Sequence, residues 1–186
     1  MLPFAMIAFI LHPLCSGRVH EAGGPAAFSF ALWNAAQGGA DVIWVRGRWL
    51  PERLYPFGVG GFDPSGLVLV QTEDQTDALA VAEDALRDGT VPFVVLEVTA
   101  PISLTAGRRL QLAAKAGGTT GICLTPEGMG SNAAETRWHC VPVFDPQEST
   151  LQCWTLTKNK SGTLGAWHVR WDQEARRIAV VSPARE

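Results

Sequence analysis

The sequence predicts an α/β fold in which a mostly parallel sheet is covered by helices and continues into antiparallel strands near the carboxyl end. The chain has 186 residues, 47% hydrophobic and 18% charged, so it can bury one substantial core. Up to about residue 125, short apolar runs alternate with segments of helical period, as a parallel sheet covered on both faces requires. Beyond residue 136, apolar runs follow one another at hairpin spacing.

The first elements alternate between strand and helix. The run that begins at Val19 is a strand that enters a Gly-Gly-Pro turn. Residues 26–37 carry apolar side chains at helical spacing and stop at two glycines, which predicts a helix. Residues 42–45 and 66–70 are short apolar runs typical of buried strands, and a short helix is expected over residues 51–57.

The same alternation continues to residue 125. Residues 72–75 (TEDQ) have the spacing of a capping box and precede an apolar stripe that ends at Gly89, which predicts a helix. Residues 92–98 form a nearly continuous apolar strand. A helix over residues 104–116, closed by two glycines, then leads to a strand over residues 121–124.

The carboxyl-terminal third is predicted to extend the same sheet with antiparallel strands. Its expected strands cover residues 138–144, 151–157, 166–171 and 178–181. We therefore expect a single domain over residues 17–186, with a β-α-β core in 17–125 and antiparallel strands in 136–182.

Residues 1–16 form an apolar segment that differs from a secretory leader. No basic region precedes it, Pro3 and Pro13 interrupt it, and Leu14 is large for the residue before a cleaved Cys15. A membrane span needs about 20 apolar residues. We expect a core-packing strand or a start site placed too far upstream, with secretion as the alternative, and hence a cytoplasmic protein without membrane association.

The charge and cysteine content exclude several classes of protein. The net charge of −3 and the pI of about 5.8 provide no general positive field for DNA or anionic lipid. The cysteines have no C-x-x-C pair, so reduced thiols are expected. The cysteines and histidines also lack metal-ligand spacing, and no metal or other cofactor is expected. These residues are Cys15, Cys123, Cys140, Cys153, His12, His20, His139 and His168.

Several segments of the chain carry a family resemblance. Residues 41–126 contain, in order, DVIWVRGRWLPERLYPFGV, GLVLVQTEDQTDALAVAEDALRDGTVPFVVLEV and LTAGRRLQLAAKAGGTTGICLTP. These segments resemble the RecA ATPase core and, more closely, the ImuA family, the RecA-like member of the bacterial inducible mutagenesis cassette, also described as SulA-like. The similarity extends upstream to GRVHEAGGPAA and downstream to ETRWH and the Trp-rich tail. It implies a RecA-like three-layer fold.

The resemblance places a degenerate nucleotide-binding loop after the first strand. The loop corresponds to Gly23, Gly24, Pro25, Ala26 and Ala27, and the Gly-Lys-Thr of a phosphate loop is absent. Phosphate binding needs open backbone N–H groups and a lysine that neutralises charge. The plain alternative is a tight turn before a helix.

Other catalytic positions of the RecA pattern are also changed. Arg48 stands where the glutamate that orients the attacking water is expected, with Arg46 at the preceding strand end, and a guanidinium stays protonated. Glu97 stands where the magnesium-linked aspartate would lie and is either a residual cation position or a capping residue. Thr125 begins the segment where a nucleotide-sensing glutamine is expected. We therefore expect no catalysis.

Two regions are candidate contacts for a partner or for DNA. Lys158, Asn159 and Lys160, followed by Trp167, resemble the lysine-bearing hairpin that reaches a neighbouring subunit in RecA filaments; the alternative is an exposed β-turn. Arg137 and Trp138 follow the region of the second DNA loop and could hold a phosphate and stack a base; the alternative is a surface loop beside a strand.

The family resemblance implies an accessory role in DNA-damage-induced (SOS) translesion synthesis and mutagenesis. The expected partners are an ImuB-like Y-family polymerase homologue, an error-prone replicative-type DNA polymerase and RecA, with weak or indirect DNA contact. One alternative is a divergent DNA-dependent ATPase that binds nucleotide through Gly23, Gly24 and Glu97. Another is a SulA-like cell-division inhibitor.

Overall fold

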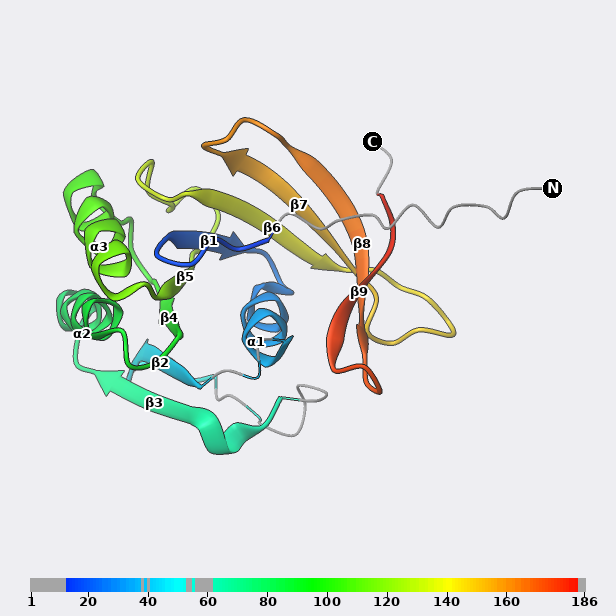
Figure 1. Ribbon diagram of the computed structural model, residues 1–186, viewed down its shortest axis with the longest axis horizontal. Helices are drawn as coiled ribbons and strands as arrows, with labels where there is room; N and C mark the ends of the chain where they lie inside the picture. Colours follow the sequence, from blue (N-terminus) through cyan, green and yellow to red (C-terminus); the bar gives the residue numbers. More distant parts are fainter. Residues whose placement is uncertain (1–12, 38, 40, 53–54, 56–61, 184–186) are drawn as a thin grey trace.

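The computed structural model describes residues 13–37, 39, 41–52, 55 and 62–183. Within this part of the chain, the strands form one sheet in the order β3-β2-β4-β5-β1-β6-β7-β8-β9 (Figure 1). The strands are β1 (Val19–Gly23), β2 (Val42–Gly47), β3 (Leu67–Thr72), β4 (Phe93–Glu97), β5 (Thr120–Leu124), β6 (Thr136–Pro142), β7 (Gln152–Asn159), β8 (Gly165–Asp172) and β9 (Arg177–Pro183). The α-helices are α1 (Ala27–Gln37), α2 (Gln75–Asp88) and α3 (Leu104–Gly117).

The sheet changes from parallel to antiparallel at β6. Strand β6 pairs in parallel with β1, and it pairs antiparallel with β7, which begins the run of hairpins through β9. Strands β1 to β5 pair only in parallel among the described residues. The predicted fold class is confirmed, whereas the single-domain boundary at residue 17 stays a prediction.

Helices cover both faces of the parallel half and so create three layers (Figure 1). Helix α1 packs on one face, where Trp44 and Val95 join its core cluster. Helices α2 and α3 pack on the other face, where Val45 and Leu96 join a second cluster. Successive residues of β2 and β4 thus face opposite sides of the sheet, which explains why these strands are apolar up to Arg46 and Glu97 at their carboxyl ends.

The start of α2 differs from the predicted capping box. The side chain of Asp74 accepts from the N–H of Asp77 at 2.9 Å and caps the helix. Thr72 is instead the last residue of β3, and its hydroxyl donates to the backbone carbonyls of Arg46 and Asp74. The strand therefore runs two residues beyond the predicted end, because its pairing with β2 continues to Gly47.

Aromatic side chains join α1 to the antiparallel half. Trp33 lies 5.8 Å from Trp154 and 5.9 Å from Trp171, measured between ring centroids. Phe30 lies 5.3 Å from Trp138 and 4.7 Å from Trp154. These tryptophans are buried, so core packing is their role in the structure.

Two sequence predictions fall mainly outside the described residues. The short helix expected over residues 51–57 and the strand expected within residues 1–16 both include positions that the structure does not describe. Leu14, which is described, packs against the α1 core. No helix in the described ranges has the length and apolar character needed to cross a membrane.

Candidate functional site

A cavity of about 450 Å³ lies at the carboxyl ends of the parallel strands, where ligands bind in open α/β sheets. Gly23, Gly24, Ala27 and Phe28 line it from the β1–α1 turn. The other lining residues follow β2, β4 and β5 and include Leu50, Glu52, Glu97, Val98, Thr99, Leu124, Thr125 and Pro126. The structure thus brings Glu97 together with most of the predicted degenerate loop.

The β1–α1 turn is packed directly against β6. The N–H of Ala26 donates to the carbonyl of Cys140 at 3.0 Å, and the N–H of Ala27 donates to the carbonyl of Gly24 at 3.1 Å. Gly24 has φ +90°, and a Cβ there would lie 2.5 Å from the Cys140 carbonyl oxygen, so only glycine fits. Two N–H groups that a phosphate cradle would leave open are therefore used inside the protein.

Glu97 forms a buried pair beside this cavity. Its side chain is 8% exposed, and its Oε1 lies 3.1 Å from Nε of Arg46 and accepts from Nε1 of Trp44 at 2.6 Å. Burial raises the pKa of Glu97, the Trp44 bond and the Arg46 charge act in the opposite direction, and the nearby Glu52 raises it further. Glu97 is thus held by one hydrogen bond, from Trp44, and one ion pair, with Arg46.

The two arginines predicted near the site have different surroundings. Arg46 is 2% exposed, and its Nη1 donates to the backbone carbonyl of Glu52, so the segment after β2 is tied to Glu97 through one guanidinium. Arg48 pairs with Glu73 at the surface, where both side chains are mostly exposed. Only Arg46 belongs to the buried cluster beside the cavity.

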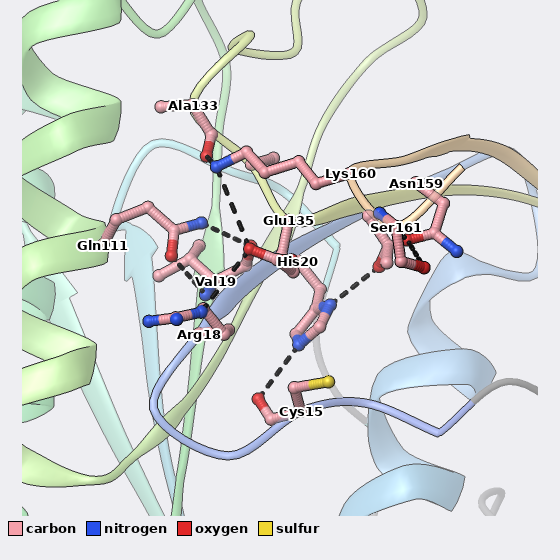
Figure 2. Close-up of polar contacts among 12 residues, drawn as sticks. Cys15, Arg18, Val19, His20, Gln111, Ala133, Glu135, Asn159, Lys160 and Ser161 are labelled. Atoms are coloured by element: carbon pink, nitrogen blue, oxygen red, sulfur yellow. Dashed lines mark hydrogen bonds and ion pairs between the residues drawn. The ribbon is translucent and has the colours of Figure 1, made fainter. Parts of the chain in front are cut away.

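The lysines of the β7–β8 hairpin contact their own chain. Nζ of Lys158 donates to the carbonyls of Asn132 and Ala134. Nζ of Lys160 donates to the carbonyl of Ala133 at 2.7 Å and lies 3.8 Å from Glu135 (Figure 2). Burial lowers the pKa of Lys158, and the neighbouring cations Lys160 and Arg137 lower it further. Both ammonium groups hold residues 132–135 against β7.

Asn159 organises the turn between these lysines and β8. Its Oδ1 accepts from the N–H of Ser161 at 3.0 Å and from the Ser161 hydroxyl at 2.8 Å, and its Nδ2 donates to the carbonyl of Thr163. This is the turn chemistry that the sequence offered as the alternative to a partner contact. Trp167 is half-buried and lies 5.7 Å from Trp138.

Arg137 and Trp138 project to opposite sides of β6. Nε of Arg137 donates to Oε2 of Glu21 at 2.8 Å, and Oε1 of Glu21, which is 1% exposed, accepts from the N–H of Ser131 at 2.6 Å. Arg137 keeps a third of its side chain exposed and lines a second cavity of about 220 Å³. Trp138 is 1% exposed, and this burial contradicts the prediction that it stacks a base.

A polar cluster that includes Gln111, Glu135 and His20 fixes the start of β1 (Figure 2). The side-chain amide of Gln111 in α3 accepts from the N–H of Val19 and donates to its carbonyl, at 3.2 and 2.8 Å. Glu135 lies 3.5 Å from Arg18. Nε2 of the fully buried His20 donates to the carbonyl of Cys15 at 3.2 Å, which ties residues before β1 to the sheet. In the described ranges, no three His, Cys, Asp or Glu side chains gather as a metal site would require.

Sequence reasoning missed two acidic residues of these sites. Glu21 sits at an inward position of a buried strand, and an acidic residue in such a strand was an available signal. Glu52 carried no signal, because its place beside the cavity depends on the path of the chain after β2.

The strand order, with a helix entered directly after β1, defines a RecA-like fold. The solved structure of the RadB recombinase matches it with a TM-score of 0.67 and 15% identity, over 91% of this chain and 93% of that one. No protein-family model matches the sequence.

Protein ImuA of Caulobacter vibrioides is similar in sequence. For strain NA1000 / CB15N and for strain ATCC 19089 / CIP 103742 / CB 15, the identity is 35% over 144 residues, covering 69% of this chain. This match supports the assignment of the chain to the ImuA family. The aligned part spans 57% of the length of these relatives.

Proposed function

We propose that this protein is a non-catalytic RecA-like accessory protein of damage-induced mutagenesis. In this role it is a scaffold that binds an ImuB-like Y-family polymerase homologue and an error-prone DNA polymerase, with RecA as a further partner. The similarity to Protein ImuA and the RecA-like fold support a role in such a system. DNA contact in this proposal is indirect or weak.

The observation that carries the non-catalytic part is the packing of the β1–α1 turn on β6. Because the N–H groups of Ala26 and Ala27 donate to backbone carbonyls, they are not available to phosphate oxygens. Among the described residues that line the cavity there is no lysine or arginine to neutralise a triphosphate. Phosphoryl transfer depends on both of these elements.

Nucleotide binding and turnover test this part directly. The purified full chain is titrated with Mg²⁺-ATP while tryptophan fluorescence is followed, because Trp44 lies beside the cavity through its bond to Glu97. Phosphate release is then measured with and without single-stranded DNA. We expect no saturable change and no release above a protein-free control. Turnover that Glu97→Gln abolishes would refute the proposal.

The scaffold part needs a test of partners in damaged cells. The exposed apolar side chains of the antiparallel half, Phe144 at 92% and Leu164 at 58%, are candidate contacts. A tagged chain should capture the polymerase homologue, and Phe144→Asp with Leu164→Asp should weaken capture. Leu112→Asp on α3, at a position that is 68% exposed, is the matched control and should leave capture of the polymerase homologue unchanged. Equal capture by all variants would contradict the assignment of this surface.

A divergent DNA-dependent ATPase is the second candidate. The cavity of about 450 Å³ at the strand ends favours it, since a RecA-like ATPase would bind nucleotide there. The fluorescence titration separates the two candidates. A deletion that leaves damage-induced mutation frequency unchanged, together with filamentation on overexpression, would favour a division inhibitor over both.

A further inference from the structure

Among the described residues, the cavity beside Glu97 is lined by more carboxylate than cationic groups, and the one cation beside it, Arg46, already pairs with Glu97. Its described lining residues include two carboxylates, Glu52 and Glu97, and no lysine, arginine or histidine. The two carboxylates are close enough for Glu52 to raise the pKa of Glu97. A cation between them would relieve this repulsion, whereas a phosphate would add to it.

Among the described residues, the protein contacts of Glu97 involve only one of its two carboxylate oxygens. Both of its protein contacts, Nε1 of Trp44 and Nε of Arg46, are made to Oε1. In the described part of the chain, Oε2 has no protein donor, although the side chain is 8% exposed and lines the cavity. A carboxylate oxygen with so little solvent gains strongly from a charged donor.

Part of the cavity wall is aromatic and apolar. Phe28 lines the cavity, is 39% exposed, and stacks on Trp44 with ring centroids 5.7 Å apart and an interplanar angle of 25°. Leu50 and Pro126 extend the apolar wall. A planar guanidinium on a methylene stem matches such a surface, because it stacks on aromatic faces and donates to carboxylates in a fork.

We propose that this cavity binds an arginine side chain of a protein partner, whose guanidinium donates to Glu52 and Glu97 and whose stem lies on Phe28. The source of the arginine rests on the proposed scaffold function. The preference of the cavity for a guanidinium does not rest on that function, since it follows from the lining residues alone. The amino end of α1 also borders the cavity and favours anions, so the test includes phosphate.

The indole resonance of Trp44 reports on the site, because its N–H donates to Glu97. The ¹⁵N-labelled full chain is titrated with N-acetyl-arginine amide, with the isosteric, uncharged citrulline derivative, with inorganic phosphate and with Mg²⁺-ATP. Trp44→Phe assigns the resonance. We expect a saturable shift with the arginine derivative and about ten-fold weaker binding of the citrulline derivative.

Two variants separate the cavity from a general charge effect. Glu52→Gln removes one carboxylate at the cavity and should weaken arginine binding by about ten-fold. Glu127→Gln removes an exposed carboxylate that lines the second cavity and should leave arginine binding unchanged. Thermal melts of both variants confirm that they are folded.

Four outcomes would overturn the proposal. They are no saturable shift with the arginine derivative, equal binding of the citrulline derivative, unchanged binding by Glu52→Gln, and tighter binding of phosphate or ATP than of arginine. The capture of partners from cells is a separate measurement, so failure of the cavity proposal and failure of the scaffold proposal are distinguishable.

Discussion

The acidic cavity of the parallel half and the lysine-bearing hairpin of the antiparallel half use charge in opposite ways. Beside the cavity, the contacts of Glu97 with described residues are all made to Oε1, and Glu52 adds a second carboxylate. In the hairpin, the ammonium groups of Lys158 and Lys160 donate to backbone carbonyls of residues 132–135. Charged residues at functional positions of a fold therefore indicate a ligand only after their internal partners are known.

The two halves also depend on each other through α1. This helix borders the cavity at its first turn, and its buried aromatic residues pack against tryptophans of the antiparallel strands. The cavity wall formed by Phe28 is thus attached to the same helix that anchors the antiparallel half.

The largest effect on stability is expected from removing the packing between α1 and the antiparallel half. Trp154 is fully buried and contacts both Phe30 and Trp33. Trp154→Ala should lower the free energy of unfolding by about 3–5 kcal/mol, because it leaves a large cavity. Urea denaturation measures this. Leu164→Ala, at an exposed position, should cost less than about 0.5 kcal/mol, and similar costs for both would refute the prediction.

A smaller effect is expected at the junction between the halves. Glu21→Gln weakens the bonds from β1 to Arg137 in β6 and to the N–H of Ser131. We expect a loss of about 2 kcal/mol in the free energy of unfolding, since bonds to a charged acceptor are replaced by bonds to a neutral one. Glu127→Gln is the control. An unchanged denaturation midpoint for Glu21→Gln would show that this pair is not a structural connection.

The contribution of Glu97 beside the acidic cavity can be tested through the pH dependence of stability. Burial raises the pKa of Glu97 in the folded state above its ordinary value of 4.5, so folding favours the protonated form. The stability of the wild type relative to Glu97→Gln should be highest below pH 4.5 and should fall as pH rises through the raised pKa. Urea midpoints across this window test the sign, with the exposed Glu73→Gln as control. A relative stability that increases with pH would contradict it.

The smallest expected effect concerns Lys160 in the lysine-bearing hairpin. Lys160→Met removes the bond to the Ala133 carbonyl and the pairing with Glu135. Because this lysine is partly exposed, the loss should be about 0.5–1 kcal/mol. Amide exchange over residues 131–135 should become faster, whereas Lys115→Met on α3 should leave it unchanged. Unaltered exchange would show that Lys160 does not hold this segment.

Sequence patterns predicted the fold better than the site. The order of strands and helices follows from periodicity, since burial on one or both faces sets which positions are apolar. Residue boundaries were less accurate: β6 covers Thr136–Pro142, two residues before the predicted range, and Phe144 lies outside it and is exposed. Pairing with β1 places Arg137 beside Glu21, and no local pattern records that register.

The candidate residues show the same limit. Gly24 and Glu97 lie at the same cavity, whereas Arg137 and Trp138 lie on opposite sides of a strand. The alternation of side chains in a strand made that separation foreseeable. The contact of Lys158 with the carbonyl of Asn132 could not be foreseen, because 26 positions separate the two residues in the chain.

The sequence by itself determined the class of fold, the absence of a phosphate-loop lysine, and the residue types at the strand ends. Tertiary structure alone decided which of these polar groups remain available. The N–H of Ala26 donates to the Cys140 carbonyl of β6, and Lys160 donates to the Ala133 carbonyl. Glu97 lines a cavity, and its contacts with described residues are made to Oε1 alone. The physical reason is that hydrogen bonds and ion pairs form between groups that are close in space, and that proximity depends on strand register and loop path.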